Sequence, residues 1–164
     1  MRRRMLIAAA VPAALSACGF KLREAPHFAF STIYFAPAAN SSLGAEIKRA
    51  ITSSGVTVIE DATRRESAQV VLDLLSDQRE KSVVGLNATG QVREFQLRTR
   101  LTFQLRTTQG RELIPETELL QQREISFNES AVLGKESEEN LLYRDMQVDL
   151  VQQLLRRLAA IKTL

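Results

Sequence analysis

The 164-residue chain has little of what most catalytic and metal sites need: it contains one cysteine, one histidine and no tryptophan. Cys18 has no partner for a disulfide, and Cys18 with His27 is too small a set for a zinc site. His27 also has no recognisable Ser or Asp partner for catalysis. Asp145 and Asp149 lie one helical turn apart, a spacing that suits a solvated helix face better than two catalytic carboxylates. We therefore expect no enzyme, no metal and no cofactor.

Long apolar runs are also scarce, and the clearest one stands at the start of the chain. Arginines at positions 2–4 precede an apolar segment at 5–15, which is well short of the roughly 20 residues that a membrane-spanning helix needs. This layout is typical of a signal peptide. We predict that residues 1–17 are removed by cleavage after Ala17, that Cys18 becomes the first residue, and that residues 18–27 form a tether.

The stretch LSAC at residues 15–18 resembles the lipobox of bacterial lipoproteins. The resemblance implies that the thiol of Cys18 carries a diacylglycerol and its amine a fatty acid such as palmitate. Two or more acyl chains hold a protein firmly at a membrane, whereas one chain does so only marginally. Gly19 stands where lipoproteins of the inner membrane commonly carry Asp, so the resemblance points to the periplasmic face of the outer membrane. The alternative, a buried structural cysteine, would require Cys18 to lie inside a fold.

The positive charge of the chain belongs mainly to the predicted signal peptide. The full chain has a formal net charge of +3, and losing the three arginines lowers Lys plus Arg from 22 to 19, equal to the 19 Asp and Glu. A neutral mature chain gives no electrostatic reason to expect nucleic acid as a partner. Residues 28–164 are enough for a single domain with a hydrophobic core.

The first part of this domain predicts a strand, a helix and a second strand. Alternating residues at 28–35 indicate a strand. Capping side chains at 40–42 and apolar residues at helical spacing from Leu43 to Ile51 indicate a helix that ends at Gly55. Residues 56–59 form the second strand. This order in about 30 residues predicts a βαβ unit with parallel strands.

The middle of the chain predicts long antiparallel strands. From 92 to 107 the odd positions are mostly apolar and the even positions polar, as expected for a strand with one buried and one wet face. Residues 69–84 form its partner through the loop GLNATG at 85–90. Residues 108–110 suit a three-residue hairpin with Gly110 in the left-handed conformation, leading into a strand at 111–127.

Arg98, Arg100 and Arg106, at even positions of the central strand, suggest a stripe of positive charge that could bind phosphate. The expected strand register argues against this, because it places glutamates opposite this stripe. A three-residue loop would place Arg106 opposite Glu112, Thr102 opposite Glu116 and Arg100 opposite Glu118. Such pairs make a solvated, nearly neutral face. We favour that interpretation over phosphate or nucleic-acid binding.

The last element is a helix predicted at 138–161, with Ser137 as its N-cap and Glu138 and Glu139 in its first turn. A broad apolar face should cover the sheet; part of it could instead dock a partner. The expected fold is therefore an α/β (α+β) two-layer sandwich with a βαβ start, a mixed sheet and a C-terminal helix on that sheet.

Four stretches together resemble the LptE family of lipopolysaccharide-assembly lipoproteins. They are the start CGFKLR, the segment IKRAITSSGVTVIED, the two long strands joined by a glycine-containing loop, and the closing RDMQVDLVQQLLRRLAAI. The resemblance implies a two-layer fold that plugs an LptD β-barrel, helps that barrel assemble and takes part in lipopolysaccharide transport.

The resemblance also implies lipopolysaccharide binding by basic side chains near the strand loop and before the last helix. Lys135 falls at the second place. The loop itself has no Arg or Lys, and the nearest are Lys81 and Arg93 on the flanking strands. Ammonium and guanidinium groups there could meet lipid A phosphates. The interpretation set against this is that Lys135 is an ordinary exposed lysine.

Two other functions stay open at this point. The chain could be a free-standing periplasmic lipoprotein that binds a small ligand or lipid between the sheet and only two helices. It could also be an enzyme with a composite site that the sequence does not reveal.

Overall fold

The computed structural model describes residues 26–128 and 132–164, and for Val132 and Leu133 only the backbone. The predicted signal peptide, Cys18 and most of the predicted tether lie outside the described residues. The elements in chain order are β1 (Thr32–Tyr34), α2 (Ser42–Ser53), β2 (Thr57–Ile59), the 3₁₀ helix η1 (Ala62–Ser67), β3 (Val70–Leu86), β4 (Val92–Thr107), β5 (Glu112–Ser126) and α3 (Val132–Ala159).

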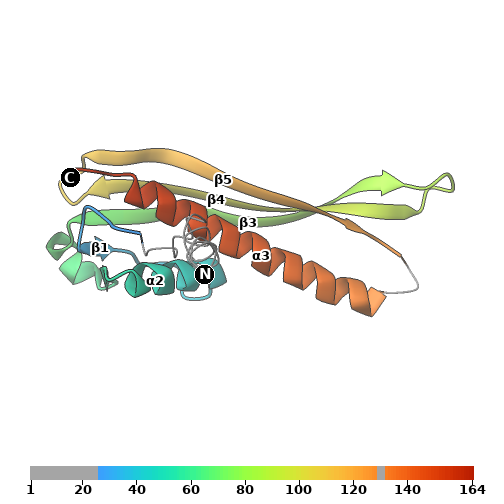
Figure 1. Ribbon diagram of the computed structural model, residues 1–164, viewed down its shortest axis with the longest axis horizontal. Coiled ribbons are helices and arrows are strands. Elements are labelled where there is room, and N and C mark those ends of the chain that lie inside the picture. Colours follow the sequence, from blue (N-terminus) through green and yellow to red (C-terminus); the bar gives the residue numbers. More distant parts are fainter. Residues whose placement is uncertain (1–25, 129–131) are drawn as a thin grey trace, which may run out of the picture.

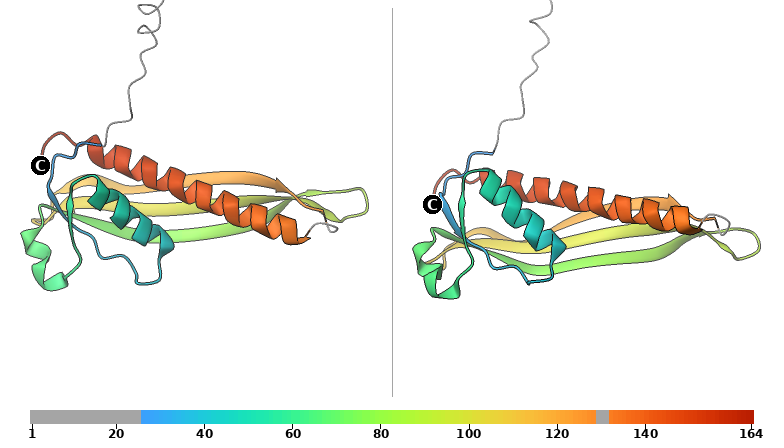
Figure 2. Two further views of the ribbon diagram at one scale, coloured as in Figure 1. Left: turned by 60° about the horizontal axis from the view of Figure 1, so that its bottom comes forward. Right: turned by 90° about the horizontal axis from the view of Figure 1, so that it is seen from below.

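One five-stranded mixed sheet with the order β2-β1-β3-β4-β5 forms the first layer. The short β1 is parallel to both β2 and β3, while β3, β4 and β5 are antiparallel to one another. The helices α2 and α3 lie on the same face of this sheet, with α3 running along the long strands (Figures 1 and 2). The predicted two-layer α+β fold and its C-terminal helix on the sheet are confirmed.

The long axis of the molecule separates two ends. The β3–β4 hairpin loop, residues 87–91, and the start of α3 lie at one end, and the C-terminus lies at the other (Figure 1). We call the first the hairpin end. The βαβ unit packs toward the opposite end, so the long strands reach the hairpin end accompanied only by α3.

Local sequence accounts for the boundaries of α2. The hydroxyl of Ser41 accepts a hydrogen bond from the backbone N–H of Gly44 at 2.9 Å, which caps the helix start as predicted. The helix ends just before Gly55, whose φ of +86° is readily adopted only by glycine.

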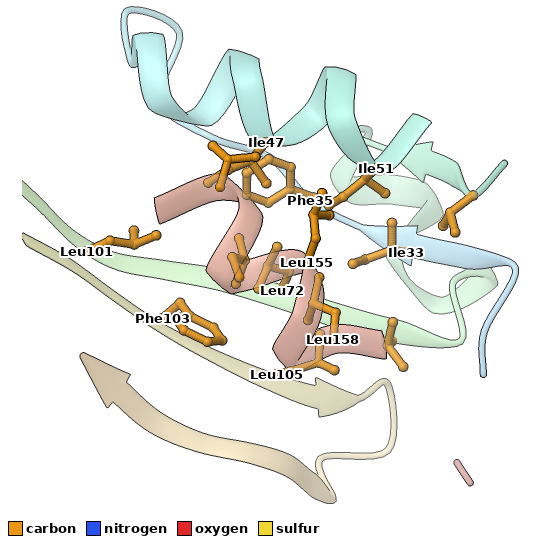
Figure 3. Close-up of a cluster of buried hydrophobic side chains, with 14 of the residues drawn as sticks. Ile33, Phe35, Ile47, Ile51, Leu72, Leu101, Phe103, Leu105, Leu155 and Leu158 are labelled. Carbon is orange, nitrogen blue, oxygen red and sulfur yellow. The ribbon is translucent and has the colours of Figure 1, made fainter. Parts of the chain in front are cut away.

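The main core lies between the helices and the helix-facing side of the sheet (Figure 3). The odd positions of β4 supply its floor, because alternate strand residues point to the same face: Leu101, Phe103 and Leu105 are fully buried. Residues of α2 and α3 cover them, and the labelled side chains include Ile47, Ile51, Leu155 and Leu158 (Figure 3). A second, smaller cluster of Leu97, Ile125, Tyr143 and Met146 continues the core toward the hairpin end.

Several element boundaries differ from the prediction: the first strand, for example, spans only Thr32–Tyr34 and not residues 28–35. The helix α3 begins at Val132 rather than near Glu138, so Ser137 lies inside it and is not its N-cap. β3 continues to Leu86, which shortens the predicted loop, and η1 was not predicted. Periodicity could not place the start of α3, because the stretch before Glu138 is mostly polar or small and carries no apolar stripe.

The predicted β4–β5 register is correct only beside the loop. Gly110 has the expected positive φ of +92°, and Arg106 lies opposite Glu112. Two irregularities in β5 then shift the pairing, so Thr102 lies opposite Glu118 and Arg100 opposite Leu120. An extra residue in one strand of a pair shifts the partner of every residue beyond it. The sequence around Pro115 did not reveal that β5 contains such extra residues.

Candidate functional site

A small hollow of about 100 Å³ lies near the hairpin end, between the sheet and the first turns of α3. Its lining comes from β3, from β4, from the end of β5 and from α3: Lys81, Phe95, Ile125, Ser126, Phe127, Lys135, Glu136 and Glu139. Two of the three predicted ligand-binding residues, Lys81 and Lys135, therefore meet at one place although 54 positions separate them in the chain. We call this hollow and its lining the lysine hollow.

Lys81 is held by two contacts within the lysine hollow. Its Nζ lies 2.6 Å from Oε2 of Glu139 on α3. The same Nζ lies 4.4 Å from the centroid of the Phe95 ring, within the range of a cation–π contact. The side chain still exposes 38% of its surface, so its ammonium remains within reach of a ligand.

Lys135 lies in the first turn of α3, and not in a loop before the last helix as predicted. Its Nζ donates to Oε2 of Glu138 at 2.8 Å and to the hydroxyl of Ser126 at 3.1 Å. The side chain exposes 22% of its surface. Lys135 is therefore a partly covered, oriented cation rather than a freely rotating surface lysine.

Arg93 does not line the lysine hollow. It lies on β4, two residues before Phe95, at a point where the pairing of β4 with β3 is irregular. The side chain is exposed, and within residues 26–128 and 132–164 no carboxylate forms an ion pair with it. Its carbonyl accepts a hydrogen bond from the N–H of Phe127 at 2.7 Å, which ties the chain beyond β5 to this end.

Sequence reasoning missed the carboxylates and the aromatic floor of the lysine hollow. Glu138 and Glu139 were assigned to the helix dipole, yet they are the ion-pair partners of the two lysines. Phe95 and Phe127 meet edge to face with ring centroids 5.3 Å apart. The spacing of three residues between Lys135 and Glu138 suits an ion pair on one helix face. That signal becomes visible only when the predicted helix begins before Lys135.

The opposite, helix-free face of the sheet carries the arginine stripe, and its arginines are partly paired. Arg100 lies 3.4 Å from Glu118, the predicted partner, which the shifted register places diagonally across from it. Arg106 pairs with Asp73 of β3 at 2.9 Å rather than with Glu112. This face is polar, with neighbouring charges of both signs.

A larger open cleft of about 620 Å³ lies between the segment that follows β1 and the part of β3 that β1 does not pair with. Its lining is mixed, with Tyr34, Pro37 and Arg65 on one side and Asp73, Asp77 and Arg106 on the other, together with neighbouring residues. It opens beside the sheet edge, and the space under the helices is filled by the core side chains of Figure 3. A ligand there would sit beside the sandwich and not between its layers.

In residues 26–128 and 132–164, no group of three or more His, Cys, Asp or Glu side chains is arranged to hold a metal ion. The same part of the chain contains no helix that is long and apolar enough to cross a membrane.

Solved structures resemble this chain over most of its length. An uncharacterized lipoprotein B from Nitrosomonas europaea shares 33% identity with a TM-score of 0.74, covering 87% of this chain and 91% of that one. The rare lipoprotein B from Shewanella oneidensis has 21% identity and a TM-score of 0.66, covering 79% and 94% of the two chains. A minor lipoprotein from Acinetobacter baumannii has 24% identity and a TM-score of 0.64, covering 82% and 94%. The last two likenesses concern the fold alone.

No protein in the curated comparison matches the chain significantly. The family profile of LptE, described as lipopolysaccharide-assembly, matches residues 30–158, which include all five strands, α2, α3 up to its last residue but one, and the whole lysine hollow. Together with the Nitrosomonas likeness, this match shows that the chain belongs to the LptE family.

Proposed function

We propose that this chain is a lipoprotein of the outer membrane, anchored at the periplasmic face through Cys18, that plugs an LptD-like β-barrel. In this role it assists assembly of the barrel and takes part in lipopolysaccharide transport to the outer membrane. The match of the LptE family profile to residues 30–158 carries the proposal, because it spans nearly the whole described domain. The role requires no catalysis by the chain.

The shape and polarity of the domain support a place inside a barrel. The molecule is elongated, and a sheet face bearing paired charges such as Arg100–Glu118 and Arg106–Asp73 is left uncovered by the helices. The lumen of a large outer-membrane barrel is polar, so the charged side chains of such a face can stay hydrated inside it. An apolar uncovered face would argue against this placement.

The lysine hollow supports contact with lipopolysaccharide. Lys81 and Lys135 offer ammonium groups to lipid A phosphates, while Phe95, Ile125 and Phe127 offer an apolar floor. Arg93 stands on β4 nearer the hairpin loop and could meet a further phosphate. These three basic residues are the ones proposed from the sequence.

Purification of the lipidated protein tests the barrel partner. The full chain is expressed with its own signal peptide in its native cell and extracted in mild detergent. A large outer-membrane barrel should then co-purify in near-stoichiometric amount, and mass spectrometry should find acyl groups on Cys18. Isolation without a barrel would favour the free-standing, ligand-binding lipoprotein.

A charge reversal tests the ligand contact. Lys135→Glu should weaken lipopolysaccharide binding about ten-fold or more, because it replaces attraction to a phosphate by repulsion. Lys162→Glu makes the same change on an exposed lysine near the C-terminus, at the other end of the molecule, and should bind as the unchanged protein does. Equal binding by both variants would remove Lys135 from the site.

A further inference from the structure

Both lysines of the lysine hollow already hold an anion that belongs to the protein itself. Lys81 contacts Glu139 at 2.6 Å, and Lys135 contacts Glu138 at 2.8 Å. The two carboxylates are consecutive residues of α3, and they reach lysines on different elements, β3 and α3 itself. A ligand anion that meets these ammonium groups must therefore compete with groups that are already in place.

We propose that Glu138 and Glu139 are specificity-determining residues, which admit a phosphorylated amphiphile to the lysine hollow and keep carboxylate amphiphiles out. This inference rests on the proposed lipopolysaccharide contact and concerns how that site selects its ligand. A phosphate monoester carries about −1.5 to −2 charges at neutral pH and three strong acceptor oxygens. It can replace a glutamate that carries one charge, whereas a fatty-acid carboxylate has no such advantage over the same glutamate.

The two lysine–glutamate ion pairs are partly exposed to water, so replacing a glutamate by a ligand phosphate requires little free energy. The side chains of Lys81 and Glu139 expose 38% and 23% of their surfaces, and those of Lys135 and Glu138 expose 22% and 48%. Ion pairs of this kind are weak because water and salt screen them. The ion pairs can therefore open for a stronger anion without unfolding the first turns of α3. Before a ligand binds, they hold the two ammonium groups in position.

The floor of the lysine hollow supplies the apolar half of the recognition. Phe95 and Phe127 pack edge to face there, and Ile125 is buried beside them. At about 100 Å³ the hollow is smaller than the roughly 300–1,000 Å³ that encloses a drug-sized molecule. It can hold only part of an acyl chain, which leaves the charged headgroup at the rim beside the lysines.

The test measures binding of bisphosphorylated lipid A, of the same lipid without phosphates, and of palmitate to the full lipidated chain in detergent. Glu138→Gln and Glu139→Gln each remove one competitor and should tighten lipid A binding about two- to five-fold. The unchanged protein should bind palmitate only weakly, and each of these two variants should bind it with higher affinity. The double variant Lys81→Gln with Glu139→Gln should lose this gain in lipid A affinity, because it lacks the ammonium group that Glu139→Gln frees.

Glu116→Gln is the matched control. Glu116 is an exposed residue of β5, nine positions before Ile125, that does not line the hollow, and no ion pair among the described residues involves it. Its variant carries the same change in net charge and should bind lipid A as the unchanged protein does. Equal gains in all three glutamine variants would show a general charge effect and overturn the inference.

Two further outcomes separate this inference from the proposed function. If the unchanged protein binds lipid A and the Glu138 and Glu139 variants bind no tighter, the inference is wrong and the proposed lipopolysaccharide contact stands. If neither the unchanged protein nor any variant binds lipid A more tightly than its dephosphorylated form, the proposed contact itself is wrong, and the inference fails with it.

Discussion

Tyr143 of α3 donates its hydroxyl hydrogen to the backbone carbonyl of Glu80 on β3 at 2.9 Å. This bond ties the helix to the long strand beyond the reach of α2, beside the lysine hollow. The side chain is 8% exposed, and the guanidinium of Arg79 lies 5.3 Å from its ring centroid. The contact therefore helps to set how α3 lies over the hairpin end.

The pKa of Tyr143 provides a pH test of this contact. Burial, followed by the nearby charge of Glu139, raises the pKa of the phenol above its usual value of 10.0, and Arg79 opposes the rise. The folded protein thus keeps the phenol protonated where the unfolded chain releases the proton. The stabilising contribution is complete below about pH 10 and is lost as pH rises through the higher folded pKa.

Tyr143→Phe should lower the free energy of unfolding by about 1 kcal/mol at neutral pH, because it removes the bond to Glu80. It should also flatten the fall in stability above pH 10. Urea unfolding of both proteins from pH 7 to pH 11 provides the measurement. Parallel pH curves for the two proteins would contradict the assignment.

Gln147 joins the two helices and the sheet through polar contacts. Its side chain, 7% exposed, accepts from Arg79 at 2.6 Å and from Ser42 at 3.2 Å, and donates to Glu46 at 2.6 Å. Gln147→Ala should cost about 1 to 3 kcal/mol in unfolding free energy, because it leaves the half-buried carboxylate of Glu46 without its hydrogen-bond donor. Gln153→Ala, a half-buried glutamine on the same helix, is the control and should cost far less in the same urea titration.

Phe103 tests the main core. It is fully buried on β4 beneath the helices (Figure 3). Phe103→Ala should lower the unfolding free energy by about 3 to 5 kcal/mol through lost burial and a cavity. Leu120→Ala removes a leucine that is 43% exposed and should change the midpoint of thermal unfolding little. Similar losses in both variants would contradict the assigned layers.

Two helical glycines should respond to alanine with opposite signs. A Cβ on Gly44 would press against the Cβ of Pro37 at less than van der Waals distance, whereas a Cβ on Gly134 would meet nothing within 4 Å. Gly44→Ala should therefore destabilise the protein despite alanine's better helix propensity. Gly134→Ala should stabilise it by about 0.5 kcal/mol. Differential scanning calorimetry of the two variants measures both shifts, and a gain in each would show that Pro37 moves aside.

The prediction succeeded where a pattern is local and repeats. The alternation from Val92 to Thr107 identified β4 and its buried side, and Ser41 and Gly55 marked the ends of α2. It failed where the outcome depends on partners. The start of α3, the irregular pairing around Pro115 and the role of Glu139 all depend on what lies opposite in space, which no short stretch of sequence records.

The candidate site shows the same division. The choice of Lys81, Arg93 and Lys135 came from their type and their distance in sequence from the hairpin loop and the last helix. Only the fold showed that Lys81 and Lys135 share one hollow, that Arg93 stands outside it, and that two glutamates already occupy the lysines.

The amino-acid sequence by itself determined the order of the five strands and the two long helices, and the side of β4 that is buried. Those properties follow from local periodicity and capping chemistry. Tertiary structure alone decided the strand register, the uncovered polar face and the lysine hollow. Each of these arises from contacts between residues far apart in the chain, which are settled only when β3, β5 and α3 pack against β4.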